Sequence, residues 1–185
     1  MGSSSMNEAA GTRRNGPISS QPVFDRHCRS AAEIAGTPDA VFAYVDDQAR
    51  LSSHMSKRSW MMAGSRMDLE LDSAKGQSVG SRIRMSGRVL GIRLSLDEVV
   101  TERIPPHRKV WVTIAPTRLL IIGDYRMGFD IDSNTTGSRL AVFIDYSLPA
   151  TLSGRILGML FAGAYARWCT DRMVKDAAAH FAQST

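Results

Sequence analysis

Two tyrosines and one histidine are the side chains whose types and positions best suit chemistry inside a folded domain. Tyr125 and Tyr146 fall on the apolar phase of alternating segments, so we expect both to face the core. A buried tyrosine hydroxyl can orient the carbonyl or hydroxyl group of a ligand, or donate a proton to it. His54 carries the side chain that suits proton transfer near neutral pH. A structural role stays open for the tyrosines, with each hydroxyl bonded to nearby backbone, and a role outside catalysis stays open for the histidine.

Metal-binding and nucleophile motifs give no comparable signal. The segment Gly76–Gly80 reads G-Q-S-V-G, which has the spacing of a hydrolase nucleophile elbow. That motif needs a strand before the serine and a helix after it, whereas alternating segments flank it on both sides here, so a hairpin turn is favoured. We expect no metal and no cofactor, because the histidines are scattered and have no cysteine or carboxylate cluster beside them. The four histidines are His27, His54, His107 and His180.

A group of methionines and aromatic residues is placed to line an interior. Met55, Trp60 and Met62 lie in the connection that leads to the first of the alternating segments. Methionine adapts to irregular apolar shapes, so this connection suits a ligand gate and ordinary core packing equally well. The full set that we expect to line a ligand cavity is Met55, Trp60, Met62, Met67, Met85, Leu94, Val112, Ile121, Tyr125, Met127, Tyr146, Phe161, Tyr165 and Trp168.

Hydrophobic periodicity predicts the elements that must position these residues. A first strand is expected over 24–34, and Thr37, Pro38 and Asp39 then mark the cap and first turn of a helix that ends near 46–47. A second short helix is expected over 48–55. From Met67 onward the period changes to two, which predicts half-buried antiparallel strands. These segments are 67–72, 82–89, 92–97, 110–114, 119–131 and 140–148.

A helix of about 30 residues closes the chain, capped by Thr151 or Ser153 and running to about Gln183. Its first half, Ile156–Ala166, is apolar almost all round, so we expect that half to be largely enclosed. Phe161, Tyr165 and Trp168 would then belong to the wall of the interior. The order of one strand, two short helices, six strands and a long helix predicts an α+β fold. In that fold the helix lies across a curved antiparallel sheet.

The composition is that of one ordinary domain. The 185 residues include 23 Lys and Arg, 18 Asp and Glu, and two cysteines, which we expect to be small buried side chains. Residues 1–22 have the composition of a disordered tail without a signal peptide, and 23–185 form the expected domain. No membrane span is expected, because the longest charge-free apolar run, Ile156–Ala166, is shorter than the roughly 20 residues that a span needs. We therefore expect a cytoplasmic protein.

The excess positive charge favours no nucleic-acid partner. The arginines of two neighbouring strands alternate outward beside the acidic residues of the preceding strand, and opposite charges on neighbouring strands are an ordinary way to solvate a sheet. The residues concerned are Arg82, Arg84, Arg88 and Arg93 on one side and Asp68, Glu70 and Asp72 on the other.

Four segments carry a resemblance to a known family. They are Ile34–Asp47 (IAGTPDAVFAYVDD), Val79–Arg82 (VGSR), Gly123–Tyr125 (GDY) and Gly137–Leu140 (GSRL). The chain resembles the START-like superfamily, also called SRPBCC or Bet v 1-like, in its polyketide cyclase/dehydrase and lipid-transport branch. The resemblance covers about 23–182. It implies the helix-grip fold, in which a curved antiparallel sheet of six to seven strands wraps around a long C-terminal helix, with two short helices after the first strand. It also implies a cavity between sheet and helix, and implies no reaction.

These observations support three functional hypotheses. The first is a binding protein that holds a small hydrophobic or amphipathic ligand in this cavity, such as a polyketide, a lipid or an aromatic metabolite. The second is a polyketide cyclase or aromatase-like enzyme, a cyclase/dehydratase in which Tyr125, Tyr146 and His54 give acid–base help. The third is an interaction module for a membrane, quinone machinery or the ribosome. The ligand, the oligomeric state and the presence of any reaction stay open.

Overall fold

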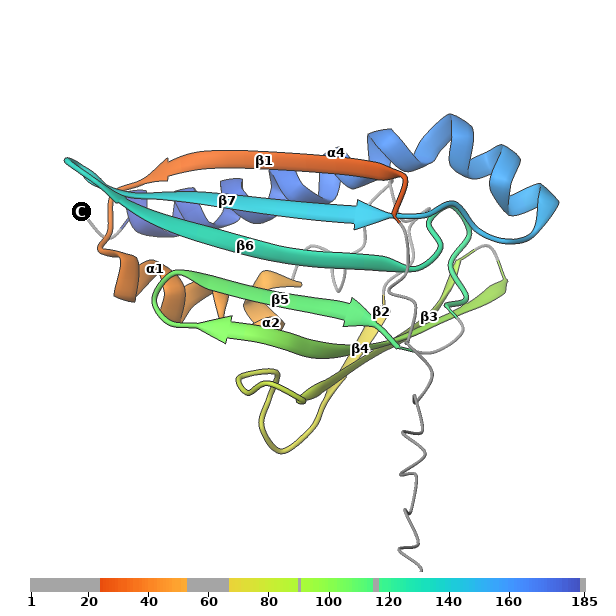
Figure 1. The fold of residues 1–185 in the computed structure, drawn as a ribbon, viewed down its shortest axis with the longest axis horizontal. Coiled ribbons are helices and arrows are strands. Elements are labelled where there is room, and N and C mark those ends of the chain that lie inside the picture. Colours follow the sequence, from red (N-terminus) through yellow and green to blue (C-terminus); the bar gives the residue numbers. More distant parts are fainter. Residues whose placement is uncertain (1–23, 53–66, 90, 115–116, 184–185) are drawn as a thin grey trace, which may run out of the picture.

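The protein is built on a seven-stranded antiparallel sheet (Figure 1). The computed structural model describes residues 24–52, 67–89, 91–114 and 117–183. Across the sheet the order is β1-β7-β6-β5-β4-β3-β2, so the first strand pairs with the last. The elements are β1 (Arg26–Ile34), α1 (Pro38–Val45), α2 (Gln48–Leu51), β2 (Met67–Leu71), β3 (Arg82–Val89), β4 (Ile92–Ile104), β5 (Arg108–Thr113), β6 (Tyr125–Asn134), β7 (Gly137–Tyr146) and α4 (Leu152–Ala182).

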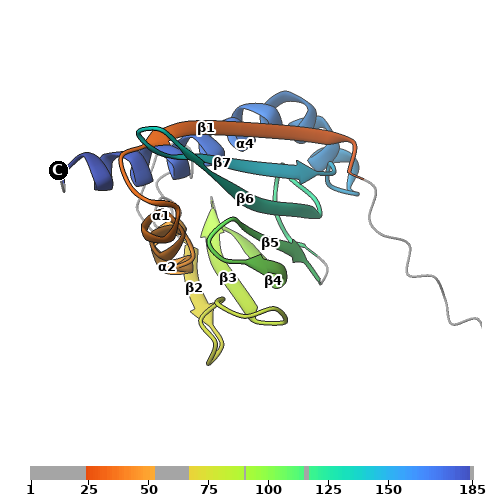
Figure 2. The ribbon, with the colours of Figure 1, turned by 60° about the vertical axis from the view of Figure 1, so that its left-hand side comes forward.

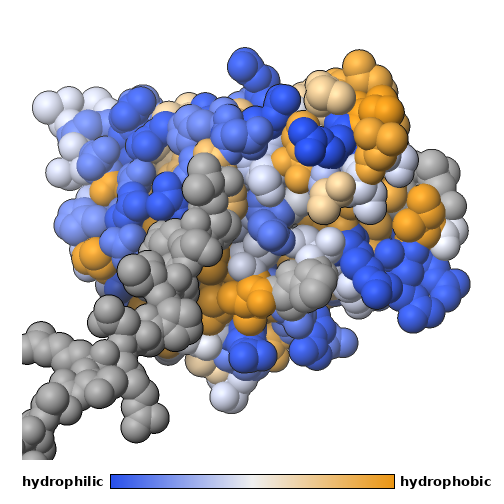
Figure 3. All heavy atoms as spheres, turned by 45° about the vertical axis from the view of Figure 1, so that its right-hand side comes forward, coloured by the Kyte–Doolittle hydropathy of each residue, from blue (hydrophilic) through white to orange (hydrophobic). Residues whose placement is uncertain are grey.

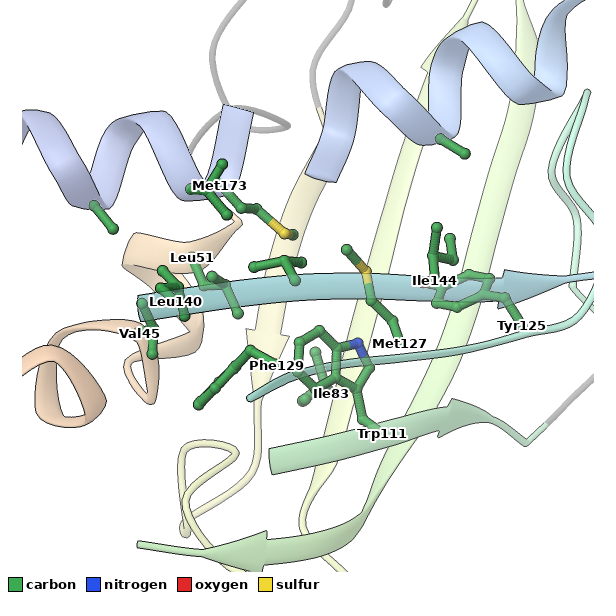
Figure 4. Packing of buried hydrophobic residues seen from close by; sticks show 14 of the residues in the cluster. Val45, Leu51, Ile83, Trp111, Tyr125, Met127, Phe129, Leu140, Ile144 and Met173 are labelled. Atoms are coloured by element: carbon green, nitrogen blue, oxygen red, sulfur yellow. The ribbon is translucent and has the colours of Figure 1, made fainter. Parts of the chain in front are cut away.

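The sheet is curved, and α4 packs along one side of its inner face. β2, β3 and β4 run at a steep angle to β1 and β7 (Figure 2). The helix packs against β1 and β7, while α1 packs against β6 and β7. Side chains from the inner face gather between the strands and these helices, among them Trp111, Met127 and Phe129, on the side where Met173 of α4 lies (Figure 4). We call this packed region between the inner face of the sheet and α4 the interior.

The first helix begins where its capping residues predict. The side chain of Thr37 accepts a hydrogen bond from the backbone N–H of Ala40 at 3.3 Å, Pro38 occupies the first turn, and Asp39 complements the positive helix end. Val41 and Phe42 turn the buried side of the helix to the sheet. The expected second helix is shorter, Gln48–Leu51, and the rest of its expected range lies outside the described residues.

A buried ion cluster ties the end of α1 to the sheet. Lys109 of β5 is fully buried, and its Nζ donates to the backbone carbonyl of Asp46 at 2.9 Å and lies 3.0 Å from Oδ1. Arg103 of β4 approaches Oδ2 of the same carboxylate at 2.8 Å. Burial lowers the pKa of Lys109, and the charge of Asp46 offsets part of that effect. The cluster therefore fixes the C-terminal end of α1 against β4 and β5.

The expected orientation of β5 is wrong. Its apolar alternation, Val110, Val112 and Ile114, was expected to face the core, but the register sets Trp111 opposite inward-facing Met127. Trp111 is 1% exposed, whereas Ile114 is 42% exposed. Burying the large apolar surface of the indole stabilises the fold more than burying the β-branched side chains would. Lys109 can be buried on the same face because it forms an ion pair with Asp46.

The segment before β6 also differs from expectation. A single strand was expected over 119–131, but β6 begins at Tyr125, and Gly123 instead donates a backbone hydrogen bond to the carbonyl of Ser147 at 2.9 Å. A Cβ on Gly123 would lie 2.8 Å from the carbonyl oxygen of Leu148, so this close approach requires glycine. On β6 itself, Gly128 leaves room for the side chain of Phe143 on the outer face.

The long helix has the predicted limits but not the predicted burial. Thr151 caps it by accepting from the backbone N–H of Gly154 at 3.3 Å. Residues with small or no side chains recur every fourth position on its buried side: Gly154, Gly158, Ala162 and Ala166. This stripe brings the helix close to the chain beneath it and turns the bulky residues outward. The expectation of an enclosed first half is therefore wrong, and Phe161 is 53% exposed. None of the described helices is long and apolar enough to span a bilayer.

Candidate ligand-binding interior

A buried carboxyl group lies on the inner face of the sheet. Glu98 continues the inward phase of β4 after Leu94 and Leu96, and it is 1% exposed. The register sets it opposite Ile83 of β3. The hydroxyl of Tyr125, on β6, donates to Oε1 of Glu98 at 2.5 Å. The indole of Trp111 approaches the carboxyl, but within the described residues Oε2 has no hydrogen bond of good geometry.

Burial raises the pKa of the Glu98 carboxyl toward neutral pH, where its acid form and its carboxylate form are both populated. Desolvation raises the pKa of Glu98 from 4.5 to about 7, and the hydrogen bond from Tyr125, the nearby indole of Trp111 and the charge of Lys109 offset only part of the shift. Near neutral pH the group can therefore donate a proton from one carboxyl oxygen or accept hydrogen bonds at both. Burial, followed by the adjacent Glu98, also raises the pKa of Tyr125 well above its ordinary value, so its hydroxyl stays a donor.

A second polar pair faces the interior from α4. Tyr165 and Cys169 share a hydrogen bond, and burial raises the pKa of the Cys169 thiol to about 12 despite that bond. Burial also raises the pKa of Tyr165 well above its usual value. Both groups act electrostatically on the hydroxyl of Tyr125, which places the helix pair near the sheet pair. The interior thus has two polar pairs within an apolar surround, Glu98–Tyr125 on the sheet and Tyr165–Cys169 on α4.

The structure separates the residues that were predicted to take part in chemistry. Tyr125 belongs to the Glu98 pair, whereas Tyr146, its register neighbour on β7, is buried but lies against α4. A Cβ added to Gly163 would lie 3.9 Å from the Tyr146 hydroxyl. Burial raises the pKa of Tyr146, and the charge of Arg26 offsets part of the rise. His54 lies outside the described residues.

Most of the predicted cavity residues that the structure describes lie around the interior. Buried in the core cluster are Met67, Met85, Leu94, Tyr125, Met127 and Tyr146. Partly buried and packed against it are Ile121, Tyr165 and Trp168. Val112 lies opposite Arg126 on the outer face, and Phe161 is turned to solvent, so these two are corrections to the expected lining. Met55, Trp60 and Met62 lie outside the described residues.

Glu98 is the site residue that sequence reasoning missed. The alternation of β4 was followed only to Asp97, where the outward phase ends in an ordinary acidic residue. Extended by three positions, the inward phase reads Leu94, Leu96, Glu98 and Val100. A carboxylate on the apolar phase of a strand is costly to bury without a partner, and that unusual position was the available signal.

Ion pairs link side chains of neighbouring strands on the outer face of the sheet. Arg84 approaches Asp97 at 2.8 Å and Glu70 at 3.8 Å. These side chains border a pocket of about 250 Å³, which is lined by Glu70, Leu71, Asp72, Arg82, Ile83, Arg84 and Asp97. The paired charges at its edge leave little for a ligand to neutralise, and they agree with the charged outer face that the alternation predicts.

The comparisons with known proteins identify the family of this fold. A family model described as polyketide cyclase / dehydrase and lipid transport matches residues 26–183. The chain belongs to this polyketide cyclase/dehydrase and lipid-transport family. No curated protein matches the chain. The fold expected from the family, a curved antiparallel sheet with short helices after β1 and a long C-terminal helix, is confirmed.

Solved structures similar to this family member share its fold at low sequence identity. The protein TTHA0849 from Thermus thermophilus matches with a TM-score of 0.63 and 14% identity, over 86% of this chain and 99% of that one. The major latex-like protein 151 from Panax ginseng matches with a TM-score of 0.58 and 11% identity, over 84% and 97%. The protein CV1439 from Chromobacterium violaceum matches with 0.56 and 14%, over 84% and 96%. Family and fold together fit a protein that binds hydrophobic ligands.

Proposed function

We propose that the protein binds a small, mostly apolar molecule with one oxygen-bearing group in the interior, where Glu98 recognises that group. The observation that carries the proposal is the buried Oε2 of Glu98, which has no partner of good geometry among the described residues. An unsatisfied buried polar atom costs about 1–3 kcal/mol, which a ligand hydroxyl or carbonyl would remove. Ligand sites generally combine an apolar lining with a few such polar groups.

The state of the carboxyl defines the ligand classes that fit. With a pKa of about 7, Glu98 can donate as an acid to a ligand carbonyl or accept from a ligand hydroxyl as a carboxylate. Tyr125 holds the other carboxyl oxygen and so fixes the direction in which Oε2 points. A polyketide, a lipid or an aromatic metabolite with a hydroxyl or carbonyl group meets these requirements, whereas a permanently charged molecule does not.

Native mass spectrometry of the freshly purified protein tests whether the interior carries a ligand. We expect a bound molecule that is released on unfolding and is largely absent from the variant Glu98→Leu. The variant Glu102→Gln, which changes a carboxylate bound to Arg108, is the control and should keep the molecule. A wild-type protein that carries nothing and binds no apolar probe would contradict the proposal.

A matched pair of probes tests the recognition of oxygen by Glu98. Naphthol and naphthalene differ by one hydroxyl group, so we expect wild type to bind naphthol about tenfold more tightly, the value of one hydrogen bond. Glu98→Leu should remove this preference while still binding naphthalene. An equal preference in wild type and Glu98→Leu, measured by fluorescence titration, would show that the hydroxyl is recognised elsewhere.

The Glu98–Tyr125 pair also favours a second candidate function, a cyclase/dehydratase. Oε2 would take a proton from the carbon next to a ligand carbonyl and return it to a hydroxyl group, which leaves as water as the carbon–carbon double bond forms. Tyr125 would orient the carboxyl, and the step needs no cofactor. Turnover of a β-hydroxyketone should follow a group with a pKa of about 7 and disappear in Glu98→Gln with naphthol still bound. Binding without turnover in wild type would leave the protein as a carrier.

A further inference from the structure

The first turns of α4 expose an unusual amount of apolar side chain. Six large hydrophobic residues, each between 41% and 77% exposed, occur within ten positions, over about 15 Å of helix. They are Leu152, Ile156, Leu157, Met159, Leu160 and Phe161, and we call them the α4 apolar face. Figure 3 shows hydrophobic residues gathered at the upper right, where this part of α4 lies. The other exposed large hydrophobics of the described residues are scattered singly over the sheet strands and turns.

The packing of the helix fixes this outward orientation. A Cβ on Gly158 would lie 2.7 Å from the carbonyl oxygen of Ile121 and 2.8 Å from the side chain of Leu148. A Cβ on Gly154 would lie 2.8 Å from Cβ of Pro149, in the segment between β7 and α4. Because only small residues fit against the chain below, α4 cannot rotate to bury its bulky residues. The packing of α4 therefore determines that these apolar side chains are exposed.

The charged residues that α4 itself carries beside its apolar face have one sign. No acidic residue stands between Asp145 and Asp171, whereas the exposed Arg155 and Arg167 lie within that range. Arg155 neighbours Leu152 and Met159 on the helix surface, at spacings of three and four residues. Arg167 follows Leu160 about two turns further along the same side. Bulky apolar residues with basic residues at their borders are typical of helices that lie in the interface of an anionic membrane.

We propose that the α4 apolar face is a docking surface for bilayers that contain anionic lipids, with the helix lying flat in the interface. The apolar side chains would enter the boundary between headgroups and acyl chains, to about 5–10 Å, while the two arginines contact lipid phosphates. A second copy of the chain is a poorer occupant, because a symmetric contact between the two α4 helices would bring their arginines together without an acidic residue on that part of α4 to pair with them. The surface is separate from Glu98, so docking does not depend on a ligand in the interior.

Vesicle co-sedimentation at low ionic strength tests the proposal. One set of vesicles contains phosphatidylcholine alone, and the other contains about a third phosphatidylglycerol. We expect binding to the anionic vesicles, with a bound fraction that falls as salt is added. The double variant Leu160→Ser/Phe161→Ser should lose at least about tenfold in partition. Arg155→Gln and Arg167→Gln should each lose about fivefold on anionic vesicles.

Matched controls make each outcome decisive. The double variant Ile92→Ser/Ile104→Ser removes two isoleucines of β4 that are each 50% exposed, and it should bind like wild type. Glu98→Leu should bind vesicles normally although it has lost the preference for naphthol over naphthalene, which separates this proposal from ligand binding. Leu160→Trp should shift its emission to the blue on anionic vesicles.

Three results would overturn the docking surface. The first is a wild type that binds neither kind of vesicle. The second is a Leu160→Ser/Phe161→Ser variant that binds as well as wild type, because another surface would then be responsible. The third is a wild-type dimer, seen by light scattering, that this variant converts to a monomer, because a second copy would then occupy the face.

Discussion

Glu98 and Lys109 are both buried ionisable side chains on the inner face of the sheet, but their surroundings differ. Lys109 has the carboxylate and the backbone carbonyl of Asp46 as partners. Glu98 has Tyr125 on one oxygen and no good partner for the other among the described residues. A buried charge whose hydrogen bonds are all satisfied stabilises the fold, whereas a buried group that lacks a hydrogen-bond partner suits a ligand. We therefore assign Lys109 to stability and Glu98 to the candidate site.

The raised pKa of Glu98 makes stability fall as pH rises. Between pH 4.5 and about 7 the unfolded chain releases this proton while the folded chain keeps it, so the free energy of unfolding decreases across this window. The loss from this group approaches about 3 kcal/mol above pH 7. Glu98→Gln should remove that loss and be more stable than wild type at pH 8, as measured by urea unfolding at several pH values. A variant with the wild-type pH dependence would show that Glu98 ionises normally.

The Asp46 cluster gives a second prediction at the residue scale. Asp46→Ala leaves Lys109 buried without its carboxylate and also frees Arg103, so unfolding should become easier by about 3 kcal/mol. Lys109→Met should cost less, because Asp46 keeps Arg103. Urea midpoints of the two variants and of their combination measure the coupling. If Asp46→Ala lost no more stability than Lys109→Met, the pair would not be the anchor of α1.

At the scale of elements, periodicity and capping residues predict much of the fold because they depend on local chemistry. Thr37 caps α1 as expected, Thr151 is the one of two expected residues that caps α4, and the alternation after Met67 predicts the strands from β2 onward. The orientation of β5 could not be read in this way, because the alternation favours the valine phase, whereas the choice depends on Trp111 and on Asp46, the distant partner that allows Lys109 to be buried.

The burial of α4 was mispredicted for a similar reason. Its first half is apolar all round, so hydrophobicity alone does not say which side faces the sheet. Distance decides instead, since only Gly154, Gly158, Ala162 and Ala166 allow the close approach. The candidate site was predicted in part: Tyr125 was found, but Glu98 was missed because a charged residue on an inward position was not considered.

Two glycines of α4 test this account of the helix. Gly158→Ala should destabilise by about 2 kcal/mol, because the new Cβ would meet the backbone oxygen of Ile121 at 2.7 Å. Gly163→Ala is the matched control on the exposed side, where the nearest atom is 3.9 Å away, and it should stabilise by about 1 kcal/mol through helix propensity. Thermal unfolding distinguishes the two. A stabilising Gly158→Ala would mean that the helix lies further from the sheet.

At the scale of the whole molecule, α4 contributes to two surfaces of opposite kind. Its inner side carries the small residues and the Tyr165–Cys169 pair toward the interior, and its outer side presents the α4 apolar face. If both proposals hold, a ligand of the lipid class would meet the protein at a membrane and then be held by Glu98 in the interior. Each surface can nevertheless be removed without the other, which is why their tests use different variants.

The titration of Glu98 tests most directly whether this residue is an interior acid whose unpaired carboxyl oxygen meets a ligand. Carbon NMR of the labelled Glu98 carboxyl should give a midpoint near pH 7 in the ligand-free protein, compared with 4.5 for an ordinary glutamate. Addition of naphthol should lower that midpoint, because a hydroxyl that donates to Oε2 favours the carboxylate. A midpoint near 4.5 that naphthol leaves unchanged would contradict the claim.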